Sequence, residues 1–302
     1  MPPSAQQPGA HLAPPSGAAV PSTPPAPVAV PAGATPPELQ YLVWLLGREL
    51  FAGPLTPAED KLLHYLDDVI GQEDAWAALV PRARAIIPQL MHSLRDEKQS
   101  AQALSARVAR DPNLVVEVLR LASNVGYGAG PPVADLTQAI GRLGTEGLRL
   151  AIARILLKPI FDAQADPLLA RTADRLWQHA EATAALCTQM ARIARVDALD
   201  AYLAGLMYNV GWTATFRALD RAPGGAPAAM SVAFAGALVQ RRELLFAHLV
   251  QSWSVSDLLD ALAHEILTAR PAGTGLPLGT LLRSADRAAF LQLLRNPPRA
   301  AP

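Results

Sequence analysis

The sequence contains a single cysteine, carries no net charge and has few aromatic side chains. Cys187 is alone among 302 residues, so the chain can build neither a disulfide framework nor a cysteine-based zinc site. Lysine plus arginine equal aspartate plus glutamate at 26 each, which argues against broad attraction to nucleic acid or anionic lipid. Aromatic residues make up 5%, which disfavours a stacking platform for single-stranded nucleic acid. We therefore expect no nucleic-acid partner.

Long apolar runs and targeting signals are also missing. The longest uncharged run outside the N-terminal tail, residues 222–240, is interrupted by Pro223, Gly224, Gly225 and Pro227. What remains of this run is too short to span a bilayer. The N-terminus lacks a basic segment followed by a continuous apolar one, so it does not resemble a secretory signal. These features predict a cytoplasmic protein with no membrane partner.

The composition favours helices. Hydrophobic residues make up 51% of the chain, which is enough for one core of roughly 200 residues. Alanine and leucine dominate and clusters of β-branched residues are scarce, so we predict an all-α fold. Residues 1–37 contain no Asp, Glu, Lys or Arg and hold 12 of the 28 prolines. We expect this tail and residues 296–302 to be disordered.

Local signals place several helices. Residues 38–50 have apolar side chains at helical spacing, and we expect one amphipathic helix there. Thr56, followed by proline and by Glu59, predicts a capping box for a helix that stops at Gly71. We expect residues 38–84 to form a helical extension packed on the main domain. Residues 200–212 have apolar side chains at helical spacing, at Leu203, Leu206, Met207 and Val210, and predict one buried helix.

Several short motifs follow one another along the chain. They are Pro88 with Leu90, Asp111-Pro112 with Leu114, Leu119 to Asn124, Ala139 to Gly144, Leu176 to His179, and His248 with Trp253. We expect a helix to open at Pro88. The order of these motifs resembles the HDOD domain, a helical bacterial signalling domain related to HD-type metal phosphohydrolases, over about residues 85–290. One departure is that Ser123 precedes Asn124, the reverse of the usual order in the family.

The resemblance implies where a metal site would lie. HD enzymes bind a divalent cation through an early histidine, an adjacent His-Asp doublet and a late aspartate, and the first and last of these match His179 and Asp286. Tyr208 and Asn209 stand where the doublet would be. A phenol must lose a proton of pKa about 10 to ligate well, and an amide carries no charge. We therefore predict a degenerate site with no catalytic residue, metal or cofactor.

Two further histidines, His248 and His264, also match positions around the degenerate site. They leave one alternative open, in which both join His179 and Asp286 to hold zinc in a different geometry. The simpler interpretation is that His179 is a hydrogen-bonded core histidine and that the others are packing or surface residues.

Other catalytic or phosphate-binding sites are not indicated. The glycines between residues 126 and 130 precede prolines instead of a helix, so we interpret them as a turn. Arg241 and Arg242 could contact a phosphate, but a solvated helix end is the expectation.

The resemblance implies two helical bundles, residues 85–165 and an HD-like bundle at 166–295, with a groove between them as the expected contact surface. The implied function is non-catalytic bacterial signal transduction through binding to other signalling proteins. A metal-dependent phosphohydrolase with a rearranged site is the alternative. Self-association through the helices before residue 84 is a third hypothesis.

Overall fold

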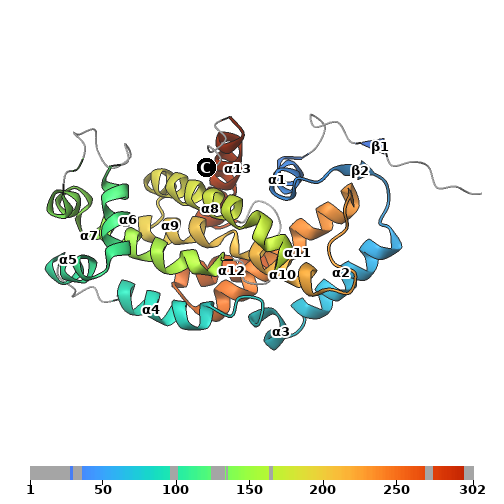
Figure 1. The fold of residues 1–302 in the computed structure, drawn as a ribbon, viewed down its shortest axis with the longest axis horizontal. Coiled ribbons are helices and arrows are strands. Elements are labelled where there is room, and N and C mark those ends of the chain that lie inside the picture. The colour runs from blue at the N-terminus through green and yellow to red at the C-terminus, as the bar shows by residue number, and fades with distance from the viewer. Residues whose placement is uncertain are drawn as a thin grey trace, which may run out of the picture.

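The computed structural model of the chain describes residues 28–29, 36–95, 101–123, 133, 135–162, 166–268 and 275–295. The rest of both predicted tails lies outside the described residues, as does the turn at residues 126–130. Helices dominate the structure (Figure 1), so the all-α prediction is confirmed. They are α1 (Pro37–Leu46), α2 (Pro57–Ile70), α3 (Glu73–Ala77), α4 (Ala83–Arg95), α5 (Ala101–Arg110), α6 (Pro112–Ala122), α7 (Leu136–Leu157), α8 (Pro167–Ala194), α9 (Ala198–Met207), α10 (Val210–Arg221), α11 (Val232–Trp253), α12 (Asp257–Leu267) and α13 (Pro277–Arg295).

Three very short strands join the N-terminal segment to α11. The central strand β2 (Leu50–Ala52) pairs antiparallel with β1 (Val28–Ala29) and parallel with β3 (Met230–Ser231). A 3₁₀ turn, Lys158–Ile160, follows α7. Across the described ranges, none of the helices has the length and apolar character needed to cross a bilayer.

The capping signals are confirmed. The Thr56 side chain accepts a hydrogen bond from the Glu59 N–H, and the Glu59 carboxylate accepts one from the Thr56 N–H, at 3.2 and 2.8 Å. The same carboxylate accepts a second bond, from the buried Ser231 N–H at 2.7 Å, which ties α2 to the start of α11. Gly71 ends α2 and Asp111 caps α6, as predicted.

Three helix boundaries differ from the predictions. The helix expected over residues 38–50 ends at Leu46, because Gly47 adopts a left-handed conformation with φ of 62° and the chain then enters β2. The helix expected over residues 200–212 is two helices, α9 and α10, which meet at Tyr208 and Asn209. Pro88 lies inside α4, which begins five residues earlier, and does not open a helix.

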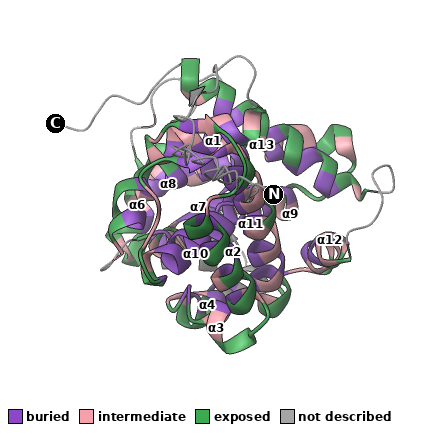
Figure 2. Cartoon of the chain, turned by 90° about the vertical axis from the view of Figure 1, so that its right-hand side faces the viewer, coloured by how far each residue is buried: buried purple, intermediate pink, exposed green. Residues whose placement is uncertain are grey.

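The buried side chains form two clusters. The larger one contains residues from α1 to α4 together with α8 to α13, and the smaller one is built from α5, α6 and α7 at one end of the molecule (Figure 1). Helix α7 contributes to both, through Leu150 and Leu157 on one side and Leu148 and Ile152 on the other. Figure 2 shows buried residues concentrated along α7, α10 and α11. The domain boundaries at residues 85 and 165 remain predictions.

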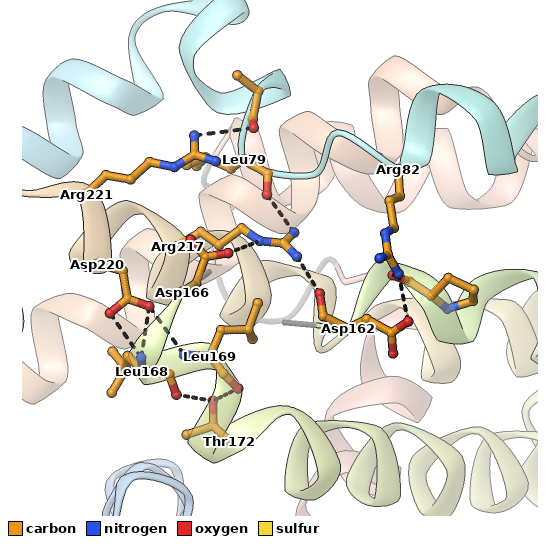
Figure 3. Close-up of polar contacts among 12 residues, drawn as sticks. Leu79, Arg82, Asp162, Asp166, Leu168, Leu169, Thr172, Arg217, Asp220 and Arg221 are labelled. Carbon is orange, nitrogen blue, oxygen red and sulfur yellow. Dashed lines mark hydrogen bonds and ion pairs between the residues drawn. The ribbon is translucent and has the colours of Figure 1, made fainter. Parts of the chain in front are cut away.

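A buried arginine on α10 anchors the connection between α3 and α4. Arg217 donates to the Leu79 and Asp162 carbonyl oxygens, each at 2.8 Å, and to the Asp166 carboxylate at 2.9 Å (Figure 3). On the same helix, Asp220 accepts bonds from the first N–H groups of α8. These contacts place the helices before residue 80 against the central helices.

We predict that Arg217→Met lowers the free energy of unfolding by about 3 kcal/mol, because it leaves the partly buried Asp166 carboxylate, the buried Leu79 carbonyl and the Asp162 carbonyl without their partner. The matched control is Arg221→Met, since Arg221 makes one 3.3 Å bond to the Ala78 carbonyl from an exposed position. We expect that control to change stability by less than about 1 kcal/mol. Denaturant unfolding measures both, and equal losses would contradict the anchoring role of Arg217.

Candidate functional site

Four of the residues predicted to mark a degenerate metal site lie together. His179 comes from the middle of α8, Tyr208 and Asn209 from the junction of α9 and α10, and Asp286 from α13. The first three are almost fully buried, and the Asp286 side chain is 20% exposed. The structure therefore brings one face of α8 together with the helix junction and with α13.

A glycine explains how α10 packs so closely on α11. A Cβ atom at Gly211 would lie 2.4 Å from the Arg242 carbonyl oxygen, closer than atoms can approach. The absence of a side chain there lets the backbone of α10 pack directly on α11 beside Tyr208 and Asn209.

The hydrogen bonds of His179 fix its tautomer. The Asn209 side-chain nitrogen lies 2.9 Å from the Leu176 carbonyl oxygen, which can only accept, so that atom is the NH₂ group. The same NH₂ group lies 3.0 Å from Nδ1 of His179, which must accept. The other nitrogen, Nε2, lies 3.0 Å from the Asp286 backbone carbonyl and donates to it. Burial lowers the pKa of His179, which agrees with a neutral ring whose two nitrogens are both engaged.

Tyr208 is a neutral phenol held by a carboxylate. Its hydroxyl donates to Glu243 at 3.0 Å, and its ring meets Phe246 edge-on at 5.1 Å between centroids. Burial raises the pKa of Tyr208 well above its usual value, so the group keeps its proton at neutral pH. A protonated phenol that already donates to a carboxylate is a poor metal ligand.

Sequence reasoning missed the strongest charge in the site. Arg242 was expected at a solvated helix end, but that expectation is wrong: it lies in the middle of α11 and is 4% exposed. Its Cζ atom is 3.8 Å from the centroid of the Tyr208 ring, and Nη2 is 3.8 Å from Oδ1 of Asp286. Burial opposes its charge, whereas the carboxylates of Asp286 and Glu243 favour it.

A signal for this burial was present in the sequence. Arg242 is four residues after Leu238 and three before Leu245, and both leucines are fully buried. Residues three and four apart lie on the same face of a helix, so Arg242 falls on the apolar stripe of α11.

Helix α1 covers the site from outside. The Tyr41 ring lies 4.3 Å from the His179 ring between centroids, and its own edge contacts with Phe290 join α1 to α13. A small cleft of about 80 Å³ remains between α1, α10, α11 and α13. It is lined by Glu38, Tyr41, Tyr208, Trp212, Val239, Arg242, Glu243, Arg283 and Asp286.

The residues present do not fit a divalent cation. His179 has no free lone pair, the NH₂ group of Asn209 is the part of the amide that faces the His179 ring, and a guanidinium lies beside the Asp286 carboxylate. Within the described ranges, His, Cys, Asp and Glu side chains form no group of three that could hold a metal ion. No reaction step can therefore be derived through a metal here.

His248 and His264 are not part of this group, which corrects the expectation that they lie at the degenerate site. His248 follows Arg242 by six residues, about 9 Å along the same helix, and stacks on Trp76 at 5.5 Å. His264 is exposed on α12. The alternative in which these two histidines join His179 and Asp286 around zinc is therefore not supported by the arrangement.

A larger cavity of about 410 Å³ lies between α3, α4 and the C-terminal end of α11. Its lining includes Pro88 and Trp253, two residues of the HDOD-like motifs, but most of its N-terminal wall comes from residues 73–84, before the first predicted bundle. The lining is mainly apolar, with polar groups from three residues. Its residues are Glu73, Trp76, Ala77, Val80, Ala83, Arg84, Ile87, Pro88, Leu249, Ser252 and Trp253.

Comparison with known proteins decides the family. The family model of the HDOD domain matches residues 80–255, more than half of the chain. The chain belongs to the HDOD domain family. This HDOD protein is also 23% identical over 137 residues to an uncharacterized protein of Treponema pallidum (strain Nichols). That alignment covers 44% of the chain and spans only a quarter of the length of this curated relative.

Two solved structures resemble this HDOD protein. A protein from Shewanella amazonensis SB2B, described as a candidate metal-dependent phosphohydrolase, aligns with a TM-score of 0.57 at 13% identity, over 81% of this chain and 86% of that one. An HDOD domain protein of unknown function from Geobacter sulfurreducens aligns at 18% identity and a TM-score of 0.49, over 70% of this chain and 72% of that one. The likeness to the Shewanella protein shows a shared fold.

The pKa of His179 makes stability depend on pH. Because burial lowers this pKa in the folded state, the unfolded chain binds more protons at acidic pH. The contribution of neutral His179 is complete above pH about 6.5 and is lost as the pH falls, with a slope of at most about 1.4 kcal/mol per pH unit.

We predict that His179→Gln flattens the acid side of the stability profile, whereas the exposed His264→Gln leaves it unchanged. Urea unfolding between about pH 5 and pH 7.5 measures this difference. The assignment of a neutral core His179 fails if both variants keep the slope of the unmodified protein.

Proposed function

We propose that this HDOD protein is a non-catalytic bacterial signal-transduction module that acts by binding another protein. The observation that carries the proposal is the state of the predicted metal site: both nitrogens of His179 are engaged, and Arg242 lies beside Asp286. A site whose histidine nitrogens are both engaged, and whose aspartate faces a guanidinium, does not hold the metal ion that activates water for phosphoester hydrolysis in metal-dependent enzymes. Binding to another protein is then the function that we propose for the domain.

The partner-binding surface that we propose is the 410 Å³ cavity beside Pro88 and Trp253. Its size and mainly apolar wall suit a projecting apolar side chain of a partner, and the polar groups of Glu73 and Arg84 can orient it. Both charged residues are exposed.

The alternative function is a metal-dependent phosphohydrolase, which the description of the Shewanella protein favours. Metal analysis combined with a phosphodiesterase assay distinguishes the two. We expect the purified protein to hold less than one equivalent of Mn, Fe or Zn and to release no product from bis-p-nitrophenyl phosphate or cyclic dinucleotides in added Mn²⁺. Stoichiometric metal with turnover that His179→Ala abolishes would establish the enzyme instead.

The binding surface is tested separately, with two half-buried tryptophans. Trp253 lines the cavity and Trp44 does not. We predict that Trp253→Ala removes at least one protein that the unmodified domain retains from lysate of its native host, because it removes one wall of the cavity. Trp44→Ala on α1 is the matched control and should retain that protein. Quantitative mass spectrometry compares the three samples. Identical retained proteins in all three would remove the cavity from the proposal.

A further inference from the structure

The site around His179 already contains a cation. Arg242 is 4% exposed, and its guanidinium lies 3.8 Å from the Asp286 carboxylate and over the face of Tyr208. We propose that Arg242 is the resident cation of this site, which takes the electrostatic place of a metal ion and closes the site to divalent cations even when the His-Asp doublet is restored. The inference rests on the proposed function, in which the unmodified site takes no metal.

The charges around Arg242 have the signs that a cation site needs. Asp286 on α13 and Glu243 on α11 supply two carboxylates, while Tyr208 and Trp212 present aromatic faces at 3.8 and 5.4 Å from the guanidinium carbon. A partly buried carboxylate is stabilised by a positive charge close to it. In a metal enzyme the ion supplies that charge, and here the guanidinium does.

The same arrangement explains why a phenol occupies position 208. The face of an aromatic ring attracts a guanidinium, and the attraction grows when the pair is removed from water. The Tyr208 hydroxyl meanwhile donates to Glu243, which holds the ring in place at 3.0 Å. Histidine at position 208 would provide a metal ligand, but the guanidinium would still repel the ion. The absence of the His-Asp doublet and the burial of Arg242 therefore both act against binding of a metal ion.

Arg241 provides a matched control, because it is the same residue type one position away. Its guanidinium bonds Asp67 at 2.5 Å, and that carboxylate is half exposed, outside the site. The test uses the full chain in three forms: Tyr208→His with Asn209→Asp, the same pair with Arg242→Met, and the same pair with Arg241→Met. Calorimetric titration with Mn²⁺ and metal analysis after dialysis measure binding.

We expect Mn²⁺ to bind the form with Arg242→Met at least about tenfold more tightly than the doublet form, because a buried like charge at about 4 Å no longer opposes it. The form with Arg241→Met should bind as weakly as the doublet form. The inference is overturned if the doublet form binds Mn²⁺ as tightly as the form that also lacks Arg242, or if the two methionine variants behave alike.

A second measurement covers the case in which the triple variant does not fold. In the otherwise unmodified chain, Arg242→Met, Asp286→Asn and their combination are compared by thermal unfolding. We expect the combination to lower Tm by less than the sum of the single variants, because each single change leaves the other charge uncompensated. Additive shifts in Tm overturn the inference.

The two proposals can fail separately. Stoichiometric metal in the unmodified protein would contradict the proposed function. An unmodified protein free of metal, together with a doublet form that binds Mn²⁺ tightly in the presence of Arg242, would contradict only the inference about the resident cation.

Discussion

The attraction between the Arg242 guanidinium and the groups that surround it constrains the centre of this protein. A buried charge is costly unless it is compensated, and here the ring of Tyr208 and the carboxylates of Asp286 and Glu243 provide the compensation. These groups come from the α9–α10 junction, α11 and α13, so one side chain connects helices that are distant in the sequence. His179 belongs to the same group of residues, because its ring donates to the Asp286 backbone carbonyl and accepts from the Asn209 amide. These two bonds keep the ring neutral and protonated on Nε2.

The N-terminal helices belong to this arrangement although the HDOD family match begins at residue 80. Tyr41 on α1 lies against His179, and Arg217 on α10 holds the chain that connects α3 to α4. Side chains of α1 and α2 share the larger hydrophobic cluster with the central helices. The helices before residue 80 thus cover the candidate site through α1 and form one wall of the larger cavity through α3.

Local sequence signals predicted the elements whose cause is local. The capping box at Thr56 and the cap at Asp111 depend on residues three or fewer positions away, so a short window contains the whole interaction. The meeting of His179, Tyr208, Asn209 and Asp286 was predictable only through family resemblance, because their contacts span 30 to 107 residues of sequence. The burial of Arg242 was missed because charged residues usually lie at the surface, and its partners on other helices cannot be read from one helix.

A neutral His179, protonated on Nε2 and lying in the same site as a guanidinium, is the feature that most directly sets this site apart from a metal centre. Nitrogen-15 NMR of the imidazole in the full-length protein, recorded at neutral pH with and without added Zn²⁺, observes that form itself. The structure predicts a protonated Nε2, an unprotonated Nδ1 that accepts a hydrogen bond, and signals that do not move when Zn²⁺ is added. A doubly protonated ring, or a large Zn²⁺-dependent shift of either nitrogen of His179, would contradict the account.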